Sequence, residues 1–442
     1  MHSIKISQLF TSYFAKLEHT HLPAASLLHP SIPMSFVMSA GLVQIETALK
    51  NELVESGKSY VLTQTCFRHF DLDKIGDSPT HLSLFHMPGA FDFGTHNKPQ
   101  TIYRLWHLLT NIYSLDKNTL KITYFNGEDS PFDAIKIDEE AKSVWLSLGL
   151  DPTQVVGRCA SHNLWQQGGG IKNSVRYRKC GVSTEVFFDR GTKYSCGINC
   201  LPGCSCSRYI ELANMLFVSH KLDEGIGQYS SLSLPFSETV IGSERIAMVL
   251  QNQTSIFKIN SIAPMTDIVD SYCASKQLDN LKAKSIIVDH IRALAYLVAD
   301  GAPSPHKNGR QRIVRKLIRS ILTQCIILQI PVSNCIHDLL QNIKMRIQSA
   351  EYTAWLKTTE QYFEEESIKF YKTISRGKTK LNSFLNANDG SVLTGHQVLF
   401  LEKTIGLPLE LTKHFLIQLS IPYPQQQYLV EYSKWIDEQN KY

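Results

Sequence analysis

The sequence lacks any apolar run long enough to cross a membrane. A membrane-spanning helix needs about 20 consecutive, mostly apolar residues, whereas the most apolar stretch here, residues 320–332, is interrupted by Gln324 and Pro331. The N-terminus has no long apolar segment, no small-residue cleavage site and no arginine before residue 68, so it is typical of neither a secretory signal nor a transit peptide. We therefore expect a protein with no membrane partner and a cytoplasmic location.

The chain also lacks a large net charge of either sign. The chain carries 45 Lys and Arg against 40 Asp and Glu, a net charge of +5 with histidines neutral, which is too mild to indicate a nucleic-acid partner by itself. The ten cysteines are unusual, because four of them fall between residues 196 and 206 while the others are scattered. A secreted disulfide framework is not usually spread in this way, so we expect a reducing compartment. Together these features exclude membrane, fibrous, disordered and disulfide-rich classes.

Local patterns predict strands in the first half of the chain and helices in the second. Two β-prone stretches, residues 61–68 and 81–87, flank a turn-rich linker and predict an antiparallel hairpin with a long loop. Residues 163–217, which include three consecutive glycines and the clustered cysteines, are expected to be rich in loops. From about residue 255 the apolar spacing predicts long helices and few strands. The length suggests two or three domains at about 100–200 residues each, and we place one boundary near residue 254.

Residues 301–337 contain no aspartate or glutamate. The cationic side chains of this stretch are Lys307, Arg310, Arg312, Arg315, Lys316 and Arg319. The last four follow the spacing of a single helix face, where like charges repel one another by about 0.2–0.5 kcal/mol per pair. We expect phosphate groups from outside the chain to neutralise this face. A solvated charged face is the alternative interpretation.

The clustered cysteines offer enough soft ligands for one tetrahedral zinc ion. They are Cys196, Cys200, Cys204 and Cys206. Their spacing differs from the usual pair of Cys-x2–4-Cys units, and either Cys180 or His162 could replace one of the ligands. Because all four candidate ligands are thiolates, a structural zinc is favoured over a catalytic one. A group of reduced thiols in a loop is the alternative.

Several stretches of the sequence resemble, in order, the motifs of the alanyl-tRNA synthetase family. In the catalytic part they are FVMSAGLVQIETAL (36–49), TQTCFR (63–68), HLSLFHM (81–87), NLW (163–165), EVFFDRG (185–191), CLPGCSCSRYIELANMLF (200–217) and ETVIGSERIAMVLQ (238–251). Downstream they are IIVDHIRALAYLVADGAPS (286–304), VRKLIRSIL (314–322) and TGHQVLFLEKTIGLPLELT (394–412). Each motif alone is weak, whereas their order and spacing together carry the resemblance.

The resemblance implies an α+β fold of the class II synthetase kind, an antiparallel sheet flanked by helices and followed by an all-helical domain. It assigns residues 1–254 to an adenylate-forming catalytic domain and residues 255–442 to tRNA recognition. The implied reaction uses ATP with Mg²⁺ to convert alanine or a similar small amino acid to an adenylate and transfers it to the 3′ end of a tRNA. Family members continue into editing and oligomerising domains that are not seen here, so the resemblance implies a monomer without editing.

The resemblance also implies roles for individual residues. Adenylation needs fixed cations on the phosphates of ATP, and the matching catalytic residues are Arg68 and Arg245. The other matching ATP-site residues are His81, Phe85 and Gly242, and those of the amino-acid site are Trp165, Asn214 and Glu238. The implied tRNA contacts are Lys307, Asn308, Arg310, Arg312, Arg315, Lys316, Arg319 and Lys403. Taken alone, residues such as Phe85 and Trp165 are more often core aromatics, and Arg245 could be a surface helix residue.

The sequence departs from the family pattern at several of these positions. Glu238 replaces an aspartate and reaches one methylene further, and Val240 replaces a glycine, which predicts crowding of the backbone. His86 replaces a glutamate and so removes a carboxylate beside the nucleotide. Lys403 replaces an aspartate that helps to read a G·U pair, and a donor-only ammonium inverts the hydrogen bonding there. These changes leave two alternatives, a paralogue with another acceptor or with tolerance of an inhibitor, and a non-catalytic RNA-binding relative.

Overall fold

The computed structural model describes residues 1–29, 38, 40–44, 57–94, 97–130, 135–167, 177–223, 227–273, 280–346, 353–388 and 392–439. Most of the first motif (36–49), the three glycines at 168–170 and Arg176 lie outside the described residues. The chain divides into two compact units, residues 1–264 and 265–442. No helix in the described ranges is both long and apolar enough to cross a membrane.

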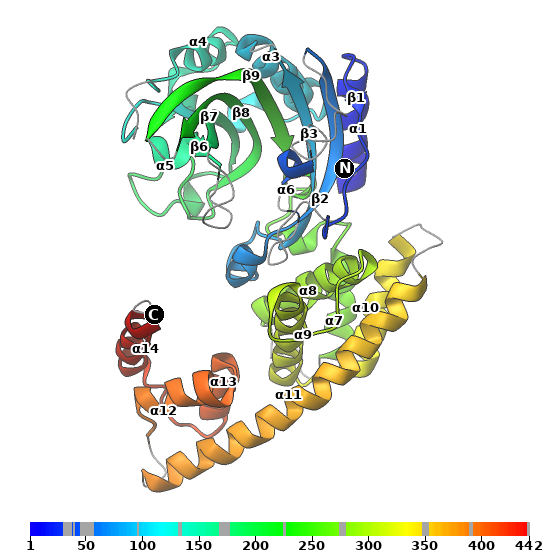
Figure 1. The fold of residues 1–442 in the computed structure, drawn as a ribbon, viewed down its shortest axis with the longest axis vertical. Coiled ribbons are helices and arrows are strands. Elements are labelled where there is room, and N and C mark those ends of the chain that lie inside the picture. Colours follow the sequence, from blue (N-terminus) through cyan, green and yellow to red (C-terminus); the bar gives the residue numbers. More distant parts are fainter. Residues whose placement is uncertain are drawn as a thin grey trace. The chain divides into compact units, whose positions relative to one another are not determined.

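A sheet of nine strands forms the centre of the first unit (Figure 1). The strands are β1 (Thr20–His21), β2 (Ser59–Phe67), β3 (Leu84–Phe93), β4 (Leu120–Phe125), β5 (Val155–Arg158), β6 (Leu164–Gln166), β7 (Tyr177–Asp189), β8 (Tyr209–Asp223) and β9 (Gln228–Ile241). They lie in the order β1-β2-β3-β9-β8-β7-β4-β5, and β6 pairs with β7. The pairs β1–β2 and β4–β5 are parallel, and the central pairs are antiparallel. The predicted fold class is confirmed, with a sheet that is mixed at its two ends.

The predicted hairpin is confirmed by the antiparallel pairing of β2 with β3. The expectation of a loop-rich segment at residues 163–217 overlooks two long strands, β7 with 13 residues and β8, which begins at Tyr209 and has 15 residues in all. Strand β7 pairs with β4, which lies far before it in the sequence, and with β8, while β8 also pairs with β9, the next strand along the chain. Local composition cannot show such pairing, since strand formation depends strongly on neighbouring strands.

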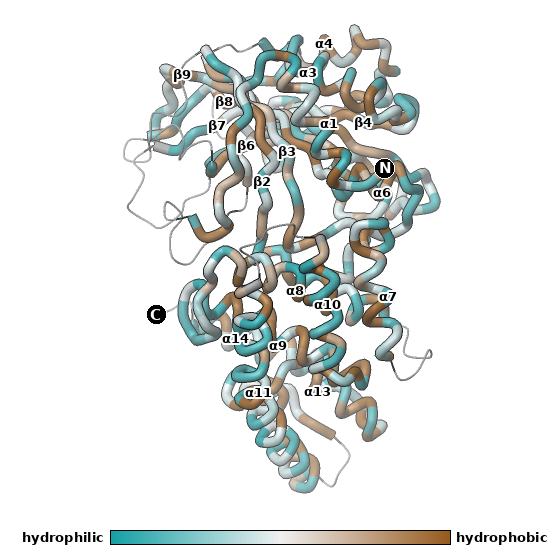
Figure 2. The backbone as a smooth tube through the Cα atoms, turned by 90° about the vertical axis from the view of Figure 1, so that its right-hand side faces the viewer, coloured by the Kyte–Doolittle hydropathy of each residue, from teal (hydrophilic) through white to brown (hydrophobic). Residues whose placement is uncertain are grey.

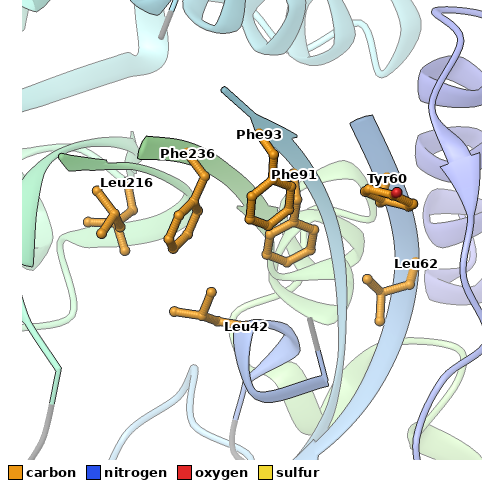
Figure 3. Packing of buried hydrophobic residues seen from close by; sticks show 8 residues of the cluster. Leu42, Tyr60, Leu62, Phe91, Phe93, Leu216 and Phe236 are labelled. Carbon is orange, nitrogen blue, oxygen red and sulfur yellow. The ribbon is translucent and has the colours of Figure 1, made fainter. Parts of the chain in front are cut away.

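Helices cover the sheet of the first unit. They are α1 (Ser3–Ala15), α3 (Lys98–His107), α4 (Glu139–Ser147), α5 (Ala160–Asn163) and α6 (Ser243–Leu250). Ile6, Phe10 and Phe14 lie one turn apart on α1 and are buried where that helix packs against β2, β3 and α6. Figure 3 shows the apolar cluster on the sheet itself, in which Phe93 and Phe236 stack with ring centroids 5.2 Å apart.

The second unit is helical throughout its described residues, as predicted for the chain beyond residue 255. Its helices are α7 (Ala263–Tyr272), which spans the division between the units, α8 (Leu281–Ala299), α9 (Gly309–Leu328), α10 (Val332–Arg346), α11 (Thr353–Ala387), α12 (Gly395–Phe400), α13 (Leu409–Gln418) and α14 (Gln425–Gln439). Helix α8 is largely buried and packs against α9, α10 and α11. Hydrophobic and hydrophilic residues alternate along α11 (Figure 2), as expected for a helix with one buried face.

Candidate functional site

A cavity of about 380 Å³ lies where β3, β8 and β9 meet the start of α6. It is the place where the sequence-predicted ATP residues come together. The predicted ATP residues that line it are Arg68, His81, Phe85, Gly242 and Arg245, and Asn214 from the predicted amino-acid site lines it as well. They belong to segments up to about 180 residues apart in the sequence. The sequence gives the order of these motifs, and the folded sheet brings them together.

Arg68 and Phe85 form one wall of the cavity. Arg68 directly follows β2, and its backbone N–H donates to the carbonyl of Ser83 on the neighbouring chain segment at 2.8 Å. Its guanidinium carbon lies 5.0 Å from the centre of the Phe85 ring, within the range of a cation–π contact. A positive charge and an aromatic face therefore stand side by side, which suits a purine nucleotide.

Arg245 is fixed at three points. Its Nη1 donates to the Glu211 side chain at 3.0 Å and to the Glu211 carbonyl at 3.2 Å, and its Nε donates to the Thr80 carbonyl at 3.3 Å. The sequence interpretation missed Glu211, although this acidic residue lies inside the quoted stretch 200–217. A cation held by backbone carbonyls is already oriented before any ligand arrives.

His81 is a neutral group in the same cavity. Burial, together with the positive charges of Arg245 and Lys74, lowers the pKa of His81 to about 4. Its Nδ1 lies 2.5 Å from the Ser78 hydroxyl. At neutral pH this side chain offers hydrogen bonds and no charge.

Glu244 provides a carboxylate beside His86. The Glu244 side chain is 4% exposed and lies 2.7 Å from Nδ1 of His86, whose backbone N–H also donates to it at 3.1 Å. Glu244 lines the cavity. Although His86 brings no carboxylate to this wall, Glu244 of α6 supplies one beside it.

The predicted amino-acid residues share one face of the sheet. Asn214 pairs with Val240, and Glu238 pairs with Leu216 on the same two strands, so these side chains lie on the same side. Asn214 and Val240 line the cavity, whereas the described lining does not include Glu238 or Trp165. Glu238 is 7% exposed, and Trp165 packs against the apolar cluster that contains Leu216.

The crowding expected from Val240 is not observed, because its neighbour is a glycine. Val240 pairs with Gly89 on β3. A Cβ atom at Gly89 would lie 3.2 Å from Cγ1 of Val240, which is tighter than ordinary van der Waals contact. The missing side chain at Gly89 thus provides the room that the valine needs.

Glu185 adds a protonated carboxyl group next to the predicted amino-acid residues. Asn214 donates to it at 3.3 Å, and the Thr123 hydroxyl donates at 3.4 Å. Burial, reinforced by the negative charge of Glu211, raises the pKa of Glu185 to about 8. Sequence reasoning missed this residue, because its displaced pKa arises from burial and becomes visible only in the structure. A displaced pKa in a cavity wall is typical of functional sites.

A second cavity of about 850 Å³ adjoins the first and shares Lys74, Thr80, His81, Glu211 and Arg245 with it. Its far wall contains Glu185, His162 and the cysteine-bearing turn at residues 203–207. The two cavities together extend from Phe85 to Cys204.

The four predicted cysteines converge in space. Their sulfur atoms all lie within 4.8 Å of one another, and the pairs Cys196–Cys204 and Cys200–Cys206 are each 3.4 Å apart. Sulfurs bound to one tetrahedral zinc at about 2.3 Å lie about 3.8 Å apart, so the donor set and its spacing fit this ion. The alternative ligands Cys180 and His162 do not belong to the group of close ligands found among the described residues.

A salt bridge closes the base of the cysteine loop. Asp189, which ends β7, accepts two hydrogen bonds of 2.8 Å from Arg208, which precedes β8. These bonds outweigh burial and hold the pKa of Asp189 below its usual value. The loop that carries the cysteines is thus held at both ends.

The cationic residues of α9 and the segment before it have different surroundings. The exposed residues are Lys307, Asn308, Arg312 and Lys316, while Arg310 is partly buried. Arg315 and Arg319 donate through Nε to the same oxygen of Glu366 on α11, at 3.1 and 2.6 Å. Part of the positive charge of these two arginines is therefore met inside the chain, by one carboxylate 47 or more residues away, and the expectation of an outside partner for the whole face stays a prediction.

Lys403 is also held within the second unit. Its Nζ lies 2.9 Å from Glu402 and stands 4.8 and 4.9 Å from the ring centres of Tyr432 and Trp435 on α14. The side chain is 25% exposed. An ammonium held by a carboxylate and two rings is less available to a nucleic-acid base than a free one.

Comparisons with known proteins concern the family of the chain. Residues 5–440 match the family model described as tRNA synthetases class II (A). The chain is 28% identical over 445 residues to "Alanine--tRNA ligase" of Thermoanaerobacter sp., covering 97% of this chain and 48% of that one. It is 28% identical over 427 residues to "Alanine--tRNA ligase" of Rickettsia prowazekii, covering 93% and 46%.

Among solved structures, apo histidyl-tRNA synthetase of S. aureus matches 58% of this chain and 67% of its own at 11% identity and a TM-score of 0.34. The chain spans about half the length of the curated relatives that it matches. The family model, in contrast, covers nearly the whole chain. The chain therefore belongs to the class II (A) tRNA synthetase family.

Proposed function

We propose that this protein activates alanine, or a similarly small amino acid, with ATP and transfers it to the 3′ end of a tRNA. The observation that carries the proposal is the convergence of Arg68, Phe85 and Arg245 on one cavity. The names of the relatives at 28% identity support alanine as the amino acid. The proposed partners are thus ATP, the amino acid and tRNA, in a reducing compartment that suits ten free thiols.

In the proposed reaction, the carboxylate of the amino acid attacks the α-phosphate of ATP, and pyrophosphate leaves. Arg68 and Arg245 neutralise the charge that develops on the phosphates, and their prior orientation makes them effective in a site shielded from water. Phe85 supplies an aromatic face for the adenine ring. The buried Glu238 would pair with the ammonium of the amino acid, since it shares a sheet face with Asn214.

Magnesium fits the residues that surround the site. Mg²⁺ prefers carboxylate oxygens and the phosphates of its nucleotide, and Glu211 and Glu244 contribute carboxylates to the cavity wall. Glu244 would hold the ion, which when bound supplies further charge neutralisation on the phosphates, while Glu211 pairs with Arg245. Arg245 keeps its two carbonyl contacts in either case, so its orientation does not depend on Glu211 alone.

ATP–pyrophosphate exchange with alanine, serine and glycine tests the proposed activation. We expect exchange with alanine at the highest kcat/KM. Exchange with none of the three would contradict both enzymatic interpretations and leave the non-catalytic relative. Subsequent charging of tRNA with the purified chain tests the transfer step separately.

The contacts of Lys403 favour a second candidate, an enzyme that delivers the amino acid without reading the G·U pair. Lys403 is held by Glu402 and by two rings of α14. Charging of paired tRNA transcripts with and without that base pair distinguishes the two candidates. Equal charging supports the second, and a large preference for the G·U transcript supports an ordinary alanine–tRNA ligase.

We further propose that Cys196, Cys200, Cys204 and Cys206 bind one structural zinc. The support is the mutual approach of their sulfur atoms. Zinc would fix the turn at residues 203–207 that lines the second cavity. Metal analysis should give about one zinc per chain, lost in Cys204→Ser and retained in the control Cys273→Ser, whose thiol lies elsewhere. A chain that folds normally without stoichiometric zinc would contradict the proposal.

A further inference from the structure

Two pairs of side chains, each one helical turn apart, face each other between α9 and α11. Arg315 and Arg319 belong to α9, and Glu366 and Phe370 belong to α11. Both arginines bond to Glu366, and the guanidinium of Arg319 also lies 5.3 Å from the centre of the Phe370 ring. Glu366 is 1% exposed and Phe370 is fully buried. The two cations therefore contact buried side chains of α11.

The geometry of these bonds leaves part of each guanidinium unused by Glu366. Both arginines donate through Nε to the same oxygen, Oε1. The other oxygen, Oε2, is buried and has no hydrogen-bond partner among the described residues. Arginine–carboxylate pairs frequently engage both carboxylate oxygens in a parallel, two-bond contact. Here the Nη groups are not spent on Glu366.

The two arginines remain accessible although their partner is not. Arg315 is 28% and Arg319 is 20% exposed, against 1% for Glu366. They lie on the same helix face as the exposed Arg312 and Lys316, in a stretch without aspartate or glutamate. The buried carboxylate of Glu366 thus holds the guanidinium groups of Arg315 and Arg319 at an accessible, positively charged surface.

We propose that Glu366 is a positioning residue that orients Arg315 and Arg319 to bind one phosphodiester of an RNA backbone. Each guanidinium has two Nη groups, which match the paired oxygens of a phosphate. Glu366 restricts the rotation of both side chains, so less conformational entropy is lost when RNA binds. The inference rests on the proposed function in requiring an RNA partner, and it adds a residue to which neither the motifs nor the charge pattern pointed.

Replacing Glu366 distinguishes a positioning role from a simple effect of charge on RNA affinity. Glu366→Gln removes one negative charge from beside a phosphate site, so electrostatics alone predicts tighter RNA binding. If Glu366 positions the arginines, RNA binding instead weakens despite the greater positive charge. We expect about tenfold weaker binding, the size of one lost charge-assisted contact, and a shallower dependence of affinity on salt because one phosphate contact is lost.

The experiment measures binding of the full-length chain to a short RNA hairpin with a single-stranded 3′ extension, over a series of salt concentrations. Glu364→Gln is the matched control, because it removes the same charge from an exposed position two residues away on α11. Glu364→Gln should bind RNA as tightly as the wild type or more tightly, with the same salt dependence. Thermal unfolding checks that both variants fold, and ATP–pyrophosphate exchange checks that the first unit is unaffected.

The outcomes separate this inference from the proposed function. Wild-type binding with no loss in Glu366→Gln, or with the same change as in Glu364→Gln, overturns the positioning role and leaves the ligase proposal intact. Absence of RNA binding by the wild-type chain counts against the proposed function itself. If Glu366→Gln is too unstable to test, Glu366→Asp retains the charge but shortens the reach. Weaker binding by that variant supports positioning, and unchanged binding contradicts it.

Discussion

Arg245 in the first unit and Arg315 and Arg319 in the second are held in opposite ways. Arg245 contacts two backbone carbonyls and a Glu211 side chain that is 40% exposed. Arg315 and Arg319 depend on a single carboxylate that is 1% exposed. A backbone acceptor cannot be moved by one substitution, whereas a side-chain acceptor can. The orientation of Arg245 should therefore survive the loss of Glu211. The orientation of Arg315 and Arg319 should not survive the loss of Glu366.

The largest expected effect is at Arg245. Arg245→Ala should lower the rate of ATP–pyrophosphate exchange by about 10²–10³-fold, the usual consequence of removing one fixed group that stabilises the transition state. Lys5→Ala, an exposed cation on α1, serves as the control and should leave exchange unchanged. Retained exchange in Arg245→Ala would show that this arginine does not contact the reacting phosphates.

A smaller effect is expected when only the acid beside Arg245 is changed. Glu211→Gln should raise the KM for ATP by no more than about fivefold, because exposed ion pairs contribute only about 0–1 kcal/mol and the two carbonyl contacts remain. Steady-state exchange at varied ATP measures this. A loss as large as that of Arg245→Ala would break the comparison and would assign Glu211 a direct role, for example on magnesium.

The comparison is sharpened within α9 itself. Arg312→Ala and Arg315→Ala should each reduce the slope of log affinity against log salt by about 0.7–0.9, one phosphate contact apiece. Only Arg315→Ala should also lower the melting temperature, since it removes one of the two cations that pair with a buried carboxylate. RNA titrations and thermal unfolding of the two variants measure this difference. Equal melting temperatures would contradict a structural role for the Arg315 pair.

The last prediction concerns the pH dependence of stability. The pKa of Glu185 is about 8 in the folded chain against 4.5 ordinarily, so between these values the folded state binds a proton that the unfolded state has lost. Its contribution to stability is full below about pH 4.5 and disappears as pH rises through about 8. Glu185→Gln should flatten the fall in unfolding free energy across this window. Denaturant unfolding of both chains at several pH values measures it, and identical pH profiles would contradict the assignment.

The sequence predicted the secondary-structure elements and the motifs better than it predicted the contacts between distant segments. The hairpin of β2 and β3 and the helices beyond residue 255 follow from local periodicity, which needs no partner. Strands β7 and β8 did not follow, because glycine and cysteine clusters obscure them and because β7 pairs with β4, which lies far before it in the sequence. The motifs predicted that Arg68, His81, Phe85, Gly242 and Arg245 belong to one site, and they line one cavity; their individual roles stay predictions.

The sequence by itself determined the family, the order of the motifs and the acid-free stretch around α9. These are properties of the chain read in one dimension. Only the tertiary structure decided which carboxylate each arginine meets, that Gly89 makes room for Val240, and that four cysteine sulfurs lie within 4.8 Å of one another. Charge and burial act through space, so Glu366 can pair with Arg319 although the two residues lie 47 positions apart in the sequence.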